Sequence, residues 1–188
     1  MPQKESGQMT EHEAYLRQAR SDFAVFQLLL EQDRDIVPAC HSLHYLQMAT
    51  EKLAKAVAIV SEVRGFDKYS HVAFSLLQNL LCRADVARKL GWGDFKAYQS
   101  FLKNSTPVFR AVDELSPSVG LGLPGGGSKE GPNSQYPWRA RDSHGTFVWC
   151  VPAEHSFRLT EQLRSGNAAQ VIQFVNNLLD RFESIFVN

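Results

Sequence analysis

Cysteine, net charge and long apolar runs are all scarce in this sequence. Only three cysteines occur among the 188 residues, and none is close enough to another cysteine or to a histidine to match zinc-finger spacing. We therefore expect reduced thiols, no metal and no cofactor. Lysine plus arginine equals aspartate plus glutamate, at 20 each, so the totals do not indicate a strongly charged partner, although they do not show how the charge is distributed.

No stretch approaches the roughly 18 consecutive apolar residues that indicate a membrane-spanning helix. The first residues, MPQKESGQMTEHEA, contain no hydrophobic signal core. The sequence therefore predicts a soluble cytoplasmic protein that does not associate with membranes. Its length suits one domain over residues 1–188, with residues 1–9 expected to be disordered because they are polar and without period.

Helical periodicity dominates the rest of the chain. Apolar residues recur at helical spacing near 10–32, 38–63, 71–90 and 167–187. These ranges predict an all-α fold, an antiparallel up-and-down bundle. A further helical stretch over 94–115 should be interrupted at Asn104 to Pro107, because proline disfavours helix in the residue before it.

Local signals predict where these helices begin and end. Thr10 and Glu13 have the spacing of a capping box, Pro38 suits a first helical turn, and Asn167 is expected to cap the last helix. Gly65 and Gly91 are expected to adopt the left-handed conformation that ends a helix.

The composition changes after residue 115. Residues 116–133 contain six of the 12 glycines, which predicts a Gly/Pro-rich loop insertion. Aromatic and β-branched residues then flank Asp142–Gly145, so a small β-hairpin is expected before the last helix. Because an isolated hairpin is only marginally stable, we expect it to lie against the helices.

The second predicted helix, from His41 to about Val63, carries a narrow polar stripe. The stripe consists of His44, Gln47, Glu51 and Lys55, at spacings of three and four residues. One interpretation is a solvated helix face. The other is a polar cluster between helices, with His71 nearby, which either fixes helix register or holds a small ligand.

The residues of this helix resemble a known family. The run His44-x-x-Gln47-x-Ala49-x-Glu51-Lys52-x-x-Lys55-Ala56 resembles the second-helix signature of HEPN domains, which reads roughly H-x-Q-Q-A-A-E-K-x-x-K-A in the most similar group. In that group a further histidine usually opens the next helix, as in Tyr69-Ser70-His71. A later R-Y-P element is matched by Gln135-Tyr136-Pro137, with glutamine in place of arginine.

The resemblance implies both a fold and a function. HEPN domains are small helical bundles found in prokaryotic toxins and defence proteins, and they commonly form homodimers. It implies a protein associated with nucleotide or nucleic-acid (RNA) binding, as part of a toxin–antitoxin or defence pair with a nucleotidyltransferase partner. The implied site is the cluster of His44, Gln47, Glu51, Lys55 and His71.

Two alternatives remain open. Many HEPN domains are metal-independent ribonucleases whose motif is an arginine and a later histidine with four to six residues between them. Arg139 and His144 fit this spacing, although Ala140 stands where the family favours a polar residue; Arg34 and His41 also fit, but lie too early in the chain. In such an enzyme the histidine moves the 2′-hydroxyl proton and the arginine stabilises the phosphate. The other alternative is a non-catalytic protein-interaction module.

Two weaker patterns favour ordinary structural roles. His41 and His44 have a spacing that can bind a metal, but no third ligand is evident. The hairpin aromatic residues could stack on bases, although packing is the commoner role of alternating aromatic residues on strands. These residues are Tyr136, Trp138, Phe147 and Trp149.

Overall fold

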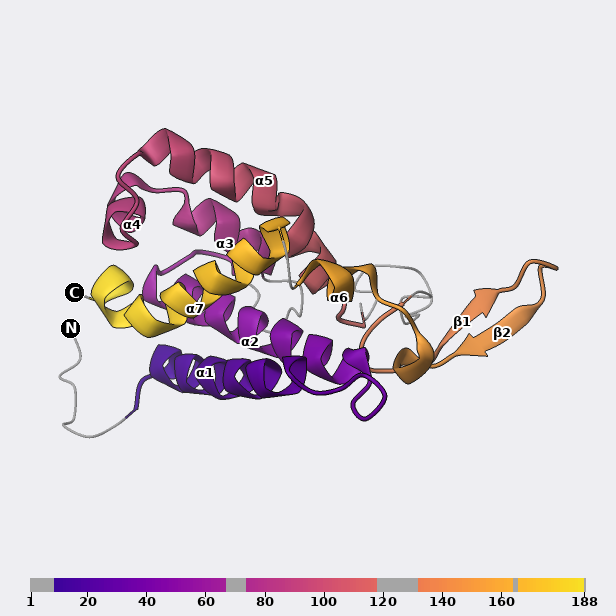
Figure 1. Ribbon diagram of the computed structural model, residues 1–188. Coiled ribbons are helices and arrows are strands. Elements are labelled where there is room, and N and C mark those ends of the chain that lie inside the picture. The colour runs from indigo at the N-terminus through magenta and orange to yellow at the C-terminus, as the bar shows by residue number, and fades with distance from the viewer. Residues whose placement is uncertain (1–8, 67–73, 118–131, 164–165, 188) are drawn as a thin grey trace.

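The chain forms a mostly helical structure with one small hairpin, shown as a computed structural model in Figure 1. The structure describes residues 9–66, 74–117, 132–163 and 166–187. The helices are α1 (Glu11–Leu30), α2 (Ala39–Val60), α3 (Phe74–Leu81), α4 (Ala84–Lys89), α5 (Phe95–Asp113), α6 (Arg158–Gln162) and α7 (Gly166–Phe186). The strands β1 (Trp138–Arg141) and β2 (Phe147–Cys150) are followed by a single 3-10 turn, η1 (Pro152–Glu154). The predicted all-α fold with a hairpin before the last helix is confirmed.

Helix α1 begins with the predicted capping box. The Thr10 backbone N–H donates to Glu13 Oε2 at 2.7 Å, and the Glu13 backbone N–H donates to Thr10 Oγ1 at 3.4 Å. These bonds satisfy two backbone donors that a helix start otherwise leaves unpaired. The apolar side of α1 then packs along α2, which runs antiparallel to it (Figure 1).

Helix α2 is the central element, and it contacts α1, α3, α5 and α7. Pro38 is its N-cap residue and lies just outside the first turn, where we expected it inside. At the other end Glu62, with φ of 51°, takes the left-handed position that we expected Gly65 to fill. The Val63 N–H donates to the Ala58 carbonyl at 3.0 Å, so the helix ends in a Schellman motif around Glu62. Gly65 is also left-handed, with φ of 70°, but lies in the loop beyond.

The prediction of one continuous helix over 71–90 is wrong, because α3 and α4 are separate helices. The Leu81 carbonyl accepts the Tyr98 hydroxyl at 3.0 Å and the Arg83 N–H at 2.7 Å. Arg83 itself is extended, with φ of −132°, so the chain turns there. Gly91 ends α4 with φ of 88°, as predicted. Ser70 and His71, the predicted start, lie outside the described residues.

Helix α5 runs without a break through Pro107, contrary to the predicted interruption. Proline has no N–H to donate to the carbonyl of the residue four positions earlier, which is Lys103. The Thr106 hydroxyl donates to that carbonyl instead, at 2.8 Å. A side chain therefore replaces the missing backbone bond, and the helix continues.

Helix α7 has the predicted apolar face but a different start. It begins at Gly166, so Asn167 lies within its first turn and not at the N-cap. The Asn167 amide donates to the Asn104 carbonyl at 2.7 Å, which ties α7 to α5. The buried face of α7 consists of Ala168, Val171, Phe174, Val175, Leu178, Leu179, Phe182 and Ile185. These side chains join one core cluster with α1 to α6.

The direction of α3 departs from a strictly alternating bundle. In Figure 1, α2 and α3 both end on the side of the molecule where α4 lies, so these two neighbours run the same way.

None of the described helices combines the length and the apolar character that crossing a membrane requires.

The hairpin projects away from the helices (Figure 1), so the expectation that it lies against them is wrong. Its antiparallel register pairs Trp138 with Cys150 and Arg141 with Phe147. Only Trp138, at the base, is buried; its ring lies 5.1 Å from the ring of His155. Residues 141–149 are all exposed. The hairpin is therefore attached through its base alone.

Candidate functional site

Three residues of the polar stripe are buried and joined to one another. Gln47, Glu51 and Lys55 are exposed by only 1%, 4% and 5%. The Glu51 carboxylate accepts from Gln47 Nε2 at 2.9 Å and from Lys55 Nζ at 2.6 Å. These bonds form because residues four positions apart lie on the same helix face. A solvated helix face is therefore excluded for these three residues. His71, the predicted fifth member of the cluster, lies outside the described residues.

A buried ion pair on the central helix is costly to form. Removing a carboxylate and an ammonium group from water carries a penalty that their mutual attraction only partly offsets. Two further contacts reduce this penalty. Gln47 donates a hydrogen bond to the second carboxylate oxygen, and Lys55 Nζ makes a cation–π contact with the Tyr15 ring, 5.9 Å from its centre. The cluster is a specific polar arrangement on a helix whose buried side chains are mostly apolar.

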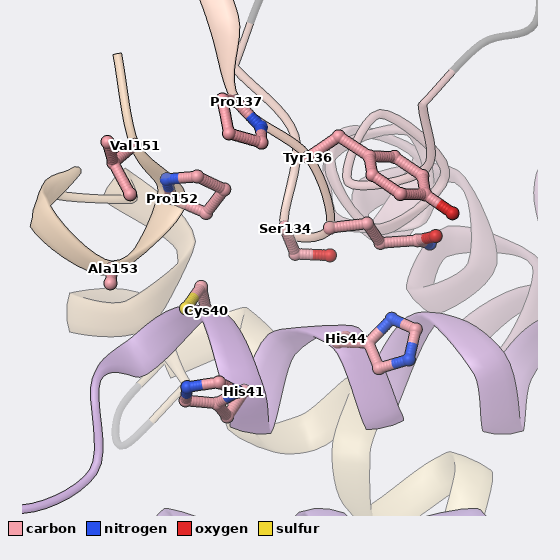
Figure 2. Close-up of a pocket in the computed structure, with 10 residues that line it drawn as sticks. Cys40, His41, His44, Ser134, Tyr136, Pro137, Val151, Pro152 and Ala153 are labelled. Atoms are coloured by element: carbon pink, nitrogen blue, oxygen red, sulfur yellow. The ribbon is translucent and has the colours of Figure 1, made fainter.

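A cavity of ≈ 430 Å³ opens at the N-terminal end of α2 (Figure 2), and we call it the α2 cavity. The first two turns of α2 form one wall, with Cys40, His41 and His44. The other walls are the segments 134–137 and 151–153. Residues 134–137 include Gln135-Tyr136-Pro137, the element that carries the later part of the family resemblance.

The segment 134–137 is held in place by an asparagine turn. Asn133 Oδ1 accepts from the backbone N–H groups of Gln135, at 2.9 Å, and Tyr136, at 2.7 Å. The Ser134 N–H donates to the Leu115 carbonyl at 3.0 Å, which fixes the turn to the end of α5. Gln135 Nε2 donates to Gln47 Oε1 at 3.4 Å. The wall of the cavity is therefore connected to the buried polar cluster.

His44 is the polar group of α2 that faces this wall. Its Nδ1 atom is buried and has no hydrogen-bond partner in the part of the chain that the structure describes. Desolvation by burial, and then the positive charge of Lys52, lower the pKa of His44 below its usual value. The imidazole is therefore neutral near pH 7, with one nitrogen that donates and one that accepts. In Figure 2 the His44 ring lies on the same side of the cavity as the Tyr136 ring, which is 61% exposed.

Cys40, deeper in the same wall, is not suited to nucleophilic chemistry. Burial raises the pKa of its thiol, and the thiol is far less nucleophilic than the thiolate. Within the described residues no three histidine, cysteine, aspartate or glutamate side chains come together to hold a metal ion. Among the described residues, no third ligand therefore joins His41 and His44 to form a metal site.

The structure places Arg139 and His144 away from the α2 cavity. Arg139 lies on β1, with its guanidinium 4.5 Å from the centre of the Phe147 ring, and His144 lies in the hairpin turn. Both are exposed. A surface hollow of ≈ 580 Å³ includes Arg139 among its lining residues but not His144. One chain alone therefore does not enclose this pair in a common site.

Sequence reasoning identified His44 and noticed Tyr136, but it missed part of the cavity wall. Val151, Pro152 and Ala153 carry no chemical signature, and only the folded chain brings them opposite Cys40. Ser134 was missed for the same reason. An Asn-x-x-Tyr turn before the hairpin was the one local signal that could have indicated a fixed loop. Comparisons of the chain with protein-family models, with curated proteins and with solved structures found no match.

Proposed function

We propose that this chain is a HEPN-type helical protein that binds a nucleotide, free or at the end of a nucleic acid, in the α2 cavity. The observation that carries this proposal is the position of His44, which lines a cavity shared with Gln135-Tyr136-Pro137. Its buried Nδ1 atom has no hydrogen-bond partner among the described residues. The family-like run of α2 and the Gln135-Tyr136-Pro137 element are far apart in sequence, yet His44, the first residue of that run, lines the same cavity as the element.

The walls offer the chemistry that a nucleotide needs. The exposed Tyr136 ring supports stacking by a base, and neutral His44 can bond to a base edge. The N-terminal turn of α2 has no side-chain cap, so its backbone N–H groups and the nearby His41 favour a phosphate. The volume of ≈ 430 Å³ falls within the usual range for small-molecule sites.

The biological setting follows from the resemblance. A nucleotide-binding HEPN protein of this kind is proposed to act in a toxin–antitoxin or defence pair, as a homodimer and with a nucleotidyltransferase-type partner. A nucleotidyltransferase gene next to the gene for this protein would support the pairing. Copurification of the two proteins would test it directly.

Titration calorimetry with a panel of nucleoside mono-, di- and triphosphates tests the binding site. We expect His44→Ala and Tyr136→Ala each to weaken binding by roughly tenfold, because each removes one contact worth about 1–2 kcal/mol. Val148→Ala, on the projecting hairpin, is the matched control and should bind as the wild type does. Failure of every nucleotide to bind at about 1 mM, or equal binding by all three variants, would contradict the proposal.

A metal-independent ribonuclease is the second proposed function. The exposure of Arg139 and His144 on a projecting hairpin favours it only in a form where a second copy completes the site. Wild-type protein should then cleave total RNA as a dimer, and His144→Ala should lose cleavage with nearly unchanged thermal unfolding, because a turn histidine contributes little packing. Equal cleavage by both proteins rejects the pair, and a monomer rejects the shared site. Absence of both binding and cleavage would leave the protein-interaction module.

A further inference from the structure

One face of the projecting hairpin combines arginine with exposed aromatic rings. Successive residues of a strand point to opposite faces, and paired residues of neighbouring strands point to the same face. With Arg139 opposite Trp149 and Arg141 opposite Phe147, these four side chains share one face. We call it the arginine–aromatic face. Trp138, Ala140, Val148 and Cys150 lie on the other.

The packing explanation for the aromatic residues fails on this face. Trp149 is 70% exposed and Phe147 is 44% exposed, whereas Trp138 at the base is buried. Large exposed rings on a two-stranded ribbon with two open edges are unusual for a surface that contacts only water. A partner is the simplest physical reason for them.

The charge on this face identifies the kind of partner. The guanidinium groups of Arg139 and Arg141 lie 4.5 and 4.0 Å from the centre of the Phe147 ring. Arg141 also donates to the Gly145 carbonyl, but neither arginine forms an ion pair with any described carboxylate. Strands β1 and β2 contain no acidic residue. In the turn, the Asp142 carboxylate accepts the His144 and Thr146 N–H groups.

A hollow of ≈ 580 Å³ lies along the hairpin and includes three residues of this face, Arg139, Arg141 and Phe147. Its other lining residues are Trp138, Ala140 and Cys150 of the opposite face, with Pro132 and His155. Arginine side chains stacked on a ring, with a second ring left open, can contact phosphates and bases together.

We propose that the arginine–aromatic face of the hairpin binds single-stranded nucleic acid, with Trp149 stacking on a base and Arg139 and Arg141 contacting the phosphates. This site is separate from the α2 cavity and requires no cleavage. Stacking and charge together favour a flexible strand with unpaired bases over a duplex, whose bases are stacked on each other. The face therefore selects single strands with little dependence on sequence.

Fluorescence anisotropy with a labelled single-stranded RNA of about ten nucleotides tests this binding. Arg139→Ala/Arg141→Ala should weaken binding by roughly tenfold or more and reduce the slope of log affinity against log salt by about 1.4, since two phosphate contacts are lost. Trp149→Ala should weaken it by at least about fivefold. The same strand in a duplex should bind less tightly than the single strand.

Matched controls separate this face from general electrostatic attraction. Arg17→Ala/Arg110→Ala removes two exposed charges from α1 and α5, and Val148→Ala removes an exposed side chain from the opposite face of β2. Both should bind RNA almost as the wild type does. All hairpin variants should keep the wild-type unfolding transition and the wild-type affinity for nucleotides at the α2 cavity, if that site binds them.

Three results would overturn the proposal. The first is that the wild-type protein does not bind the single strand. The second is that the control double variant Arg17→Ala/Arg110→Ala loses as much affinity as Arg139→Ala/Arg141→Ala. The third is a Trp149→Ala variant that converts a dimer to a monomer in sedimentation while its RNA affinity is unchanged, because the face would then join two copies of the chain.

Discussion

At the scale of single residues, the most demanding position is Glu51. Its carboxylate is buried on the central helix, where an unpaired charge is costly. Lys55 supplies the opposite charge at 2.6 Å, and Gln47 supplies a further donor. Both of these partners lie within about one turn of Glu51 on the same helix, so α2 itself supplies part of the stabilisation of the buried charge.

Removing one partner should cost more than removing both charges. We expect Lys55→Met to lower the free energy of unfolding by roughly 3–5 kcal/mol, because it removes the positive charge that lies 2.6 Å from the buried Glu51 carboxylate. The double variant Glu51→Leu/Lys55→Met should lose clearly less, since neither charge of this buried pair remains. Urea denaturation of the three proteins measures both values. An equal or larger loss in the double variant would show that the ion pair itself is the stabilising element.

The end of α2 offers a stabilising substitution. Glu62 is exposed and adopts a left-handed backbone with φ of 51°, a conformation that disfavours side chains with a Cβ atom. Glu62→Gly should raise the free energy of unfolding by roughly 0.5–1 kcal/mol. Gly65→Ala, at φ of 70°, should change it in the opposite direction. Thermal unfolding that shows Glu62→Gly to be destabilising would contradict the strain argument.

At the scale of secondary-structure elements, α5 shows how a side chain keeps a helix continuous through proline. The Thr106 hydroxyl donates to the Lys103 carbonyl that Pro107 leaves without a backbone donor. The same hydroxyl oxygen accepts a hydrogen bond from Gln78 Nε2 at 2.9 Å. One hydroxyl thus supports α5 and connects it to α3.

Thr106→Val keeps the shape of the side chain but removes its hydroxyl. We expect a loss of about 1–2 kcal/mol in the free energy of unfolding, because the Lys103 carbonyl and the Gln78 amide both lose a partner. Thr106→Ser, which retains the hydroxyl, is the control and should lose less. Chemical denaturation distinguishes the two, and similar losses in both variants would mean that the methyl group matters more.

At the scale of the whole molecule, His44 couples stability to pH. Its pKa is lowered in the folded protein, first by desolvation and then by Lys52, so the unfolded chain binds a proton more readily. Stability should therefore be fully present above the unfolded histidine pKa of about 6.5 and should decrease as pH falls below it. His44→Gln should show a weaker decrease between about pH 7 and pH 5 in urea denaturation. An unchanged pH dependence would mean that His44 is not the responsible group.

Much of the fold followed from local sequence patterns. The capping box at Thr10, the apolar face of α7 and the hairpin turn at Asp142 to Gly145 all depend on residues within a few positions of one another. The failures were also local in origin: a proline predicted a break in α5, and a continuous helix was predicted over residues 71–90. In α5, the Thr106 hydroxyl bonds to the carbonyl that Pro107 leaves without a donor, and the helix continues. Between α3 and α4, the Tyr98 hydroxyl from α5 bonds to the Leu81 carbonyl, where the helix ends.

The sequence alone determined that the chain is mostly helical and that its second helix carries an unusual stripe of polar residues, because periodicity and short-range spacing carry that information. Only the tertiary structure decided that this polar stripe is largely buried. It also decided that the β1–β2 hairpin extends into solvent. It also joined Gln135 to Gln47, which lie 88 positions apart. Such contacts depend on the relative placement of whole elements, and no spacing within one helix specifies that placement.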